Sequence, residues 1–346
     1  MSSESIKRGV GTIRPRINNR PNIDSTVLEL QSPTMAARVG DIPFICLTGI
    51  PRSGTTWINE LLGFHPLIGV GNESFLFSKH IIPQLREYYW GLGQPERGGL
   101  GLATFLGEGN FLDALRAFSE RLQRLMIASC AEKKPQISIF VDKSPPHSLM
   151  IPEIRMLHPS MRFIVMIRNP YDLIASWNRS QRTWAPWIGT SRIPDLIDIL
   201  WSYFQAIANT LDSGDAAHIL LVAYEDLWRN PSEVLRAVGR FLDVTWDTEI
   251  LASTVKSVDL REVGERSVLS IPLYGAAQTR YGPHVLVPPG FVGHASPSAG
   301  ELTLSRSDRR EIRDRLRDLE CQGPKIDELL ARASDNLTMW AECQPR

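Results

Sequence analysis

The segment with the clearest chemical pattern runs from Gly49 to Trp57 and reads GIPRSGTTW. A short apolar run over residues 43–48 precedes it, and a helical pattern over Thr55–Leu62 follows it. A strand, a glycine-bounded turn and a helix start, in this order, direct successive backbone N–H groups toward one point. The segment therefore predicts an anion-binding loop, which we call the anion loop (residues 49–57).

The anion loop differs from the phosphate loop of NTP-hydrolysing enzymes in its cation. Gly49 and Gly54 have the G-x4-G spacing of a Walker A loop, but Thr55 stands where that loop carries lysine. Arg52 instead supplies a cation from inside the loop. No Walker B carboxylate is evident, so a nucleoside or small-molecule kinase with a degenerate loop is only an alternative.

A second anion site is predicted in the segment 162–180. Arg168 follows the apolar run Arg162–Ile167, and Pro170 stands at a favoured first helical position. Ser176 comes eight residues after Arg168, which is just over two helical turns. The two side chains can therefore converge on one ligand.

Three further side chains are candidates for proton transfer or charge stabilisation. Glu73 lies 21 residues after Arg52, where the chain is expected to return to the carboxyl edge of the strands. Lys143 follows the apolar run Ile137–Val141, and His147 comes four residues after Lys143. The seven histidines show no HExxH or paired spacing, so no metal site is predicted.

The elements that position these residues form an alternating pattern of short apolar strands and helices. We expect an α/β fold in which helices flank a central, mainly parallel sheet in a single domain over residues 41–346. The predicted strands are residues 43–48, 137–141, 162–167 and 218–223. The predicted helices are residues 55–62, 170–177, 193–211, 231–242 and 307–320, with helical residues 78–135 interrupted by glycines between 91 and 109.

Two segments lack this pattern. Residues 1–40 are polar and aperiodic and are expected to form an N-terminal arm. Residues 263–297 are rich in glycine and proline and are expected to form a loop of the lid type.

Composition narrows the function classes. The 38 basic and 38 acidic residues cancel, which argues against a nucleic-acid partner. The four cysteines form no CxxC pair, and no apolar stretch approaches the ~20 residues of a membrane span. Residues 1–40 contain no apolar core of a secretory signal, so a cytoplasmic protein is the expectation.

Residues 51–57 closely resemble the 5′-phosphosulfate loop of sulfotransferases that use 3′-phosphoadenosine 5′-phosphosulfate (PAPS), and Arg168 with Ser176 resembles their 3′-phosphate site. The resemblance implies that Ser53, Gly54, Thr55 and Thr56 bind the 5′-phosphate. It also implies that Trp57 stacks on adenine and that Tyr224, in VAYEDL, contacts the nucleotide. A core tryptophan and a strand-end tyrosine are equally open alternatives for the last two.

The resemblance implies transfer of a sulfuryl group from PAPS to a hydroxyl or amine, without a metal. The arginine in the loop is similar to the tyrosylprotein and bacterial branches rather than the cytosolic branch. By this resemblance Arg52 and Lys143 stabilise charge on the leaving oxygen. Glu73 is the general base, because a carboxylate near two cations stays ionised, and His147 is the second-choice base.

The acceptor is not specified by these motifs. Aromatic residues are frequent in residues 73–109, 181–192 and 263–297, which favours a small apolar or aromatic alcohol. O- or N-sulfation and the oligomeric state stay open. A non-catalytic PAPS-binding protein is the remaining alternative, although such a protein would not require Arg52, Glu73 and Lys143.

Overall fold

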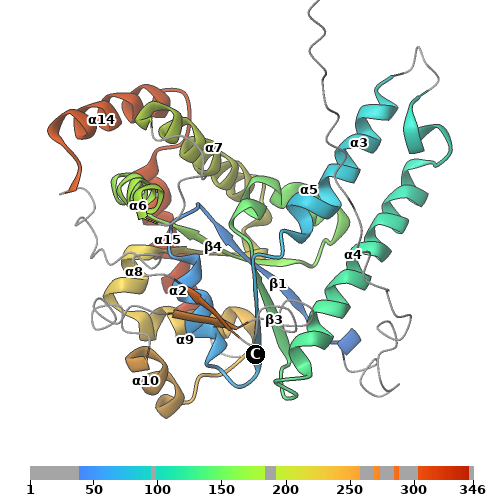
Figure 1. Ribbon diagram of the computed structural model, residues 1–346, viewed down its shortest axis with the longest axis horizontal. Helices are drawn as coiled ribbons and strands as arrows, with labels where there is room; N and C mark the ends of the chain where they lie inside the picture. The colour runs from blue at the N-terminus through green and yellow to red at the C-terminus, as the bar shows by residue number, and fades with distance from the viewer. Residues whose placement is uncertain are drawn as a thin grey trace, which may run out of the picture.

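The computed structural model describes residues 39–94, 99–183, 192–257, 269–272, 284–287 and 303–342. Its centre is a parallel sheet of five strands in the order β2-β3-β1-β4-β5 (Figure 1). The strands are β1 (Phe44–Gly49), β2 (Ile68–Asn72), β3 (Ile139–Lys143), β4 (Arg162–Ile167) and β5 (Ile219–Ala223). The predicted α/β fold with a mainly parallel sheet is confirmed.

Two strands differ from the prediction. β2 was not predicted, because its sequence IGVGN contains two glycines and offers only a weak apolar signal. β3 begins and ends two residues later than predicted, since the prediction was Ile137–Val141. Lys143 is therefore the last residue of β3 rather than a residue beyond it.

Helices cover both faces of the sheet, which explains why the strands are apolar throughout (Figure 1). One face packs against α3 (Ile82–Leu92), α4 (Glu108–Ala131), α5 (Ile151–Leu157), α6 (Pro170–Thr183) and α7 (Ile193–Asp212). The other packs against α2 (Thr55–Gly63), α8 (Tyr224–Arg229), α9 (Pro231–Leu242) and α10 (Thr248–Ser257). The short helical segments are η2 (Leu76–Ile81), η4 (Gly101–Thr104), η5 (Pro145–Met150) and η6 (Asp215–His218).

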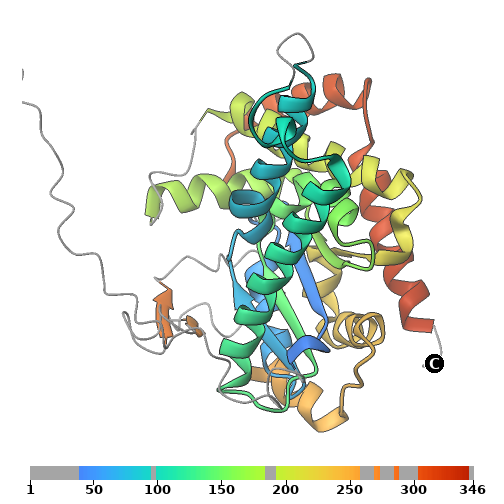
Figure 2. The ribbon, with the colours of Figure 1, turned by 90° about the vertical axis from the view of Figure 1, so that its right-hand side faces the viewer.

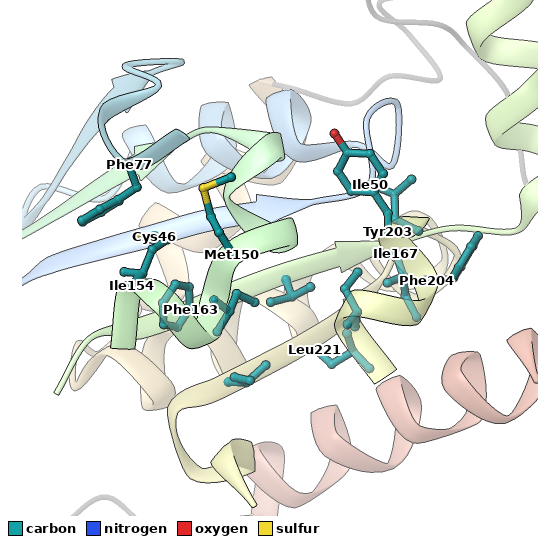
Figure 3. Packing of buried hydrophobic residues seen from close by; sticks show 14 of the residues in the cluster. Cys46, Ile50, Phe77, Met150, Ile154, Phe163, Ile167, Tyr203, Phe204 and Leu221 are labelled. Carbon is teal, nitrogen blue, oxygen red and sulfur yellow. The ribbon is translucent and has the colours of Figure 1, made fainter. Parts of the chain in front are cut away.

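Alternation along the strands divides the core into two clusters. In β4, Phe163 packs with Cys46 and Ile154 on one face, as Figure 3 shows, whereas Ile164 packs on the other face. The period of two residues produces this division. Seen from the side, the long helix α4 runs beside the sheet together with α3 (Figure 2).

The last two helices are α14 (Arg306–Glu320), which packs against α7, and α15 (Ile326–Glu342), which returns to the sheet. α15 packs on β5, and the Asn336 side-chain oxygen accepts a hydrogen bond from the Leu221 N–H at 3.0 Å. Among the described residues β5 is the edge strand, and this contact satisfies a backbone donor on its free side.

Two of the predicted segments fall largely outside the described residues. The expected arm over residues 1–40 is described only at its last two residues. Within the expected loop over residues 263–297, the structure describes β6 (Leu269–Pro272) and β7 (His284–Val287), which pair antiparallel. This part of the predicted loop is therefore regular structure.

Candidate active site

The anion loop connects β1 to α2 at the carboxyl edge of the sheet. It has three positive backbone φ angles, 143° at Gly49, 74° at Arg52 and 96° at Gly54. A Cβ on Gly54 would lie 2.6 Å from Tyr224 Cδ2, so only glycine fits there. No side chain of the described residues caps the start of α2, which leaves its first N–H groups directed at the loop.

Ser53 adds an observation that points to a ligand. Its side chain is fully buried, and its Oγ atom has no hydrogen-bond partner among the described residues. A buried hydroxyl without a partner is costly unless a ligand completes it. Together with the α2 N-terminus, Ser53 therefore fits the predicted anion.

Three arginines concentrate positive charge at the loop. Arg52 Nε donates to Ser176 Oγ at 3.2 Å, and Arg168 Nη1 approaches the Arg52 carbonyl oxygen at 3.4 Å. Burial, with repulsion from Arg168 and Arg179, lowers the pKa of Arg52 to about 10. The guanidinium still carries its charge at neutral pH. An anion bound here would offset the free-energy cost of burying this charge and would weaken its repulsion from Arg168 and Arg179.

Arg168 itself is held by an aromatic ring and a carboxylate. Its guanidinium carbon lies 3.8 Å from the centroid of the Tyr224 ring, and its Nη2 lies 3.9 Å from Asp172 Oδ2. Both Arg168 and Asp172 are buried. The structure thus brings together the residues predicted for the two anion sites, since Arg168 and Ser176 both contact Arg52.

Trp57, the last residue of the anion loop, is part of the core. It is buried on the α2 side, with its ring 5.7 Å from Tyr224 and 6.1 Å from Trp228. This placement fits the core alternative, and stacking of Trp57 on adenine stays a prediction. Tyr224 is also buried and packs against Gly54 and Arg168, and its contact with the nucleotide stays a prediction.

Glu73 and Lys143 form an ion pair where β2 and β3 end. Lys143 Nζ lies 2.7 Å from Glu73 Oε1 and 3.4 Å from Thr56 Oγ1 on α2. The Lys143 side chain is 1% exposed, whereas that of Glu73 is 40% exposed. Lys143 therefore links the carboxylate, which ligands can reach, to the first turn of α2 at the end of the anion loop.

The backbone at Glu73 is strained. Glu73 has a φ of 41° and Phe75 a φ of 52°, and with Arg52 they account for three of the four non-glycine positive φ angles in the described chain. Such conformations cost free energy and persist where the surroundings impose them, often at functional sites.

A buried carboxylate beneath Glu73 stabilises this turn. Asp142 Oδ2 accepts hydrogen bonds from Ser74 Oγ at 2.7 Å and from Ser144 Oγ at 3.1 Å. Ser144 Oγ in turn accepts from the Phe75 N–H at 3.2 Å. Burial raises the pKa of Asp142, and the two serine hydroxyls oppose this rise.

His147 is placed poorly for proton transfer. The ring is fully buried, packs edge-on against Phe77 at 5.3 Å, and has no hydrogen-bond partner among the described residues. Burial lowers the pKa of His147 to about 3. A closed apolar site gives an acceptor no access, so the geometry favours Glu73 over this second-choice base.

Two site residues were missed by sequence reasoning. Arg179 follows Ser176 by three residues and so lies on the same helix face, a spacing that could have identified it. Asp142 precedes Lys143 and points to the opposite face of the sheet, and no motif signalled its role.

The part of the chain that the structure describes contains no group of three or more His, Cys, Asp or Glu that could hold a metal ion. None of its described helices is long and apolar enough to cross a membrane.

Comparisons with known proteins agree with this geometry. Residues 43–248 match the profile of the Sulfotransferase family. Protein-tyrosine sulfotransferase A of Caenorhabditis elegans is 25% identical over 214 residues, which cover 60% of this chain and 52% of that protein. A putative protein-tyrosine sulfotransferase of Caenorhabditis briggsae is 28% identical over 209 residues, covering 60% of this chain and 68% of that protein.

The chain therefore spans only about half the length of the first of these relatives. In fold it is similar to the crystal structure of mouse sulfotransferase SULT7A1 complexed with PAP, with a TM-score of 0.51 and 13% identity. That likeness covers 88% of this chain and 93% of the mouse chain. The profile match extends over more than half of the sequence and includes the anion loop, Glu73, Lys143 and Arg168, so the chain belongs to the sulfotransferase family.

Proposed function

We propose that the protein transfers the sulfuryl group of PAPS to a hydroxyl group of a small apolar or aromatic acceptor, without a metal. The observation that carries this proposal is the Glu73–Lys143 ion pair, joined through Thr56 to the anion loop. A protein that only bound nucleotide would gain nothing from a reachable carboxylate at this place.

The two predicted anion sites divide the donor between them. The α2 N-terminus, Ser53 and Arg52 take the 5′-phosphosulfate, and Arg168 with Ser176 takes the 3′-phosphate. Phosphate groups suit these positions because guanidinium groups bind them through paired, charge-assisted hydrogen bonds.

The reaction is an in-line displacement at sulfur. Glu73 takes the proton of the acceptor hydroxyl while the hydroxyl oxygen attacks sulfur, and the bond between sulfur and the 5′-phosphate oxygen breaks. Lys143 and Arg52 stabilise the charge that grows on this leaving oxygen. Lys143 also donates a hydrogen bond to Glu73, so the base and the charge-stabilising group are in direct contact.

The test is calorimetry followed by a transfer assay. With EDTA present, we expect 3′,5′-bisphosphate and PAPS to bind and ATP to bind poorly, and labelled sulfate to move from PAPS to phenols or alcohols. Tight magnesium-dependent ATP binding without a response to the bisphosphate would support the kinase alternative. Nucleotide binding without transfer to any acceptor would support a non-catalytic binding protein.

A cytoplasmic location also stays a proposal, which fractionation of the source cells tests.

A further inference from the structure

An apolar surface lies at the end of the helical hairpin that α3 and α4 form. The two helices extend away from the sheet, and their outer ends lie at the periphery of the molecule in both views (Figure 1 and Figure 2). We call residues 88–94 and 99–107, which include η4, the hairpin tip. The described residues contain ten exposed large apolar side chains, and four of these belong to the tip, namely Trp90, Leu92, Leu102 and Phe105.

These four side chains present a large part of their surface to solvent. Phe105 is 85% exposed, and Leu102 and Trp90 are 57% and 54% exposed. A whole aromatic side chain covers about 150–250 Å², so with the two leucines the tip offers roughly 500 Å² of apolar surface. A typical soluble monomer exposes no larger apolar patch, and a patch of this extent often has a function.

The hairpin tip carries no charge in its described residues. Between its two parts, residues 95–98 contain one glutamate and one arginine, whose charges cancel. Two of its hydroxyl groups are paired within the tip, since Tyr88 Oη donates to the Leu106 carbonyl oxygen at 2.9 Å and Thr104 Oγ1 donates to the Gly101 carbonyl oxygen. Such a surface can enter apolar surroundings without burying a charge or an unpaired hydroxyl group.

The backbone of the tip forms its own hydrogen bonds. The Leu100 N–H donates to the Gly91 carbonyl oxygen at 3.2 Å, and the Phe105 N–H donates to the Leu102 carbonyl oxygen at 3.0 Å. Only glycine allows the first contact, because a Cβ on Gly91 would overlap the Leu100 carbonyl oxygen. Backbone groups that leave water for lipid must be paired in this way.

The area of the tip distinguishes a lipid bilayer from a second protein chain. A stable protein–protein interface needs about 800 Å² from each partner, which is well above the roughly 500 Å² of the tip. Reversible attachment to a bilayer needs no such area, because it grows with each apolar side chain that is buried at the interface. Tryptophan, phenylalanine and leucine are the residues that proteins use there.

From these observations we propose that the hairpin tip attaches the protein reversibly to the surface of a neutral lipid bilayer. Phe105 and Leu102 enter the boundary between headgroups and acyl chains, and Trp90 lies at the level of the headgroups. The attachment is apolar rather than electrostatic, so it depends neither on anionic lipid nor on ionic strength.

Co-sedimentation with phosphatidylcholine vesicles tests this attachment. We expect the full chain to bind, and to bind equally well at high salt. Phe105→Ser should lower the partition coefficient at least about tenfold, because an aromatic side chain no longer leaves water. Phe64→Ser is the matched control, since Phe64 is also exposed but lies at the end of α2, and it should bind like the wild type. Urea unfolding reports whether each variant is folded.

Trp90 provides a second readout. Brominated phosphatidylcholine quenches the fluorescence of indoles that reach the bilayer, so we expect it to quench the wild-type protein. Trp90→Phe keeps an apolar side chain, and vesicle binding should therefore persist while most of the quenching is lost. Quenching that Trp90→Phe leaves unchanged would show that another part of the chain enters the bilayer, and would overturn the proposal.

Three other results would also overturn it. The first is that the wild-type protein does not co-sediment, or that Phe64→Ser and Phe105→Ser weaken binding equally. The second is binding to anionic vesicles alone that high salt abolishes, which would reveal an electrostatic surface. The third is a wild-type dimer in sedimentation velocity that Phe105→Ser dissociates, which would assign the tip to a second copy of the chain. Nucleotide binding and sulfate transfer enter none of these measurements, so the proposed function is tested separately.

Discussion

The Glu73→Gln substitution is the most direct test of the proposed chemistry. Glutamine retains the shape of the side chain and an oxygen that can accept from Lys143 Nζ, now 2.7 Å from the carboxylate. It removes the ability to accept a proton. We therefore expect turnover to fall while nucleotide binding and the fold stay intact.

The size of the effect follows from the geometry. Loss of a general base lowers turnover by roughly 10²–10⁴-fold, which is about 3–5 kcal/mol in activation free energy. The cost in unfolding free energy should be only about 1 kcal/mol or less, because Glu73 is 40% exposed and solvent screens its charge. The catalytic loss therefore exceeds any loss of stability.

The assay measures labelled sulfate transfer at saturating PAPS, beside calorimetry with 3′,5′-bisphosphate and urea unfolding. Glu153→Gln is the matched control, because Glu153 forms an ion pair of 2.6 Å with Arg86 outside the site. Its turnover should equal that of the wild type.

One result would refute the reasoning. Were Glu73→Gln to retain near wild-type turnover while His147→Ala abolished it with the fold preserved, the base would be His147. The residues packed around His147 would then have to move during catalysis to expose its ring.

Three further predictions concern binding, charge stabilisation and pH. Arg168→Ala should weaken bisphosphate binding by about 2–5 kcal/mol, because a buried charge pair is lost; an unchanged calorimetric Kd would contradict the proposed 3′-phosphate site. Lys143→Ala should lower kcat more than it raises the nucleotide Kd, and the reverse pattern would make Lys143 a binding residue. Burial lowers the pKa of His147 to about 3, below its unfolded value of about 6.5, so the unfolded state binds the extra proton first. Stability should thus be lost as pH falls below about 6.5, and His147→Phe should reduce the slope of unfolding free energy by about 1.4 kcal/mol per pH unit between pH 6 and 4. Equal slopes in urea titrations would show that His147 is not buried in its neutral form.

Local sequence patterns were sufficient for the strand–loop–helix of the anion site. The apolar run before Gly49, the two glycines and the helical pattern after Gly54 all act within a few residues. β4 and α9 were placed at their observed bounds, Arg162–Ile167 and Pro231–Leu242, for the same reason. Short-range backbone preferences and the need to bury apolar strands determine these elements.

Local patterns failed where packing partners decide the structure. Trp57 has the same sequence context whether it faces a nucleotide or the core, and only the positions of Tyr224 and Trp228 place it in the core. β2 is a strand because β3 pairs with it, although its two glycines weaken the signal.

The candidate active site combines both kinds of information. The residue types of Arg52, Lys143 and Arg168 could be read from the sequence, but their convergence depends on strand order. β1 lies between β3 and β4, so the ends of strands far apart in the chain meet beside the anion loop. The Glu73–Lys143 contact and the unpartnered oxygen of Asp142 exist only in the folded chain. Parallel pairing with β2 brings the end of β3 beside Glu73, and successive residues of a strand point to opposite faces of the sheet. Lys143 therefore reaches Glu73 on one face, whereas Asp142 is buried on the other.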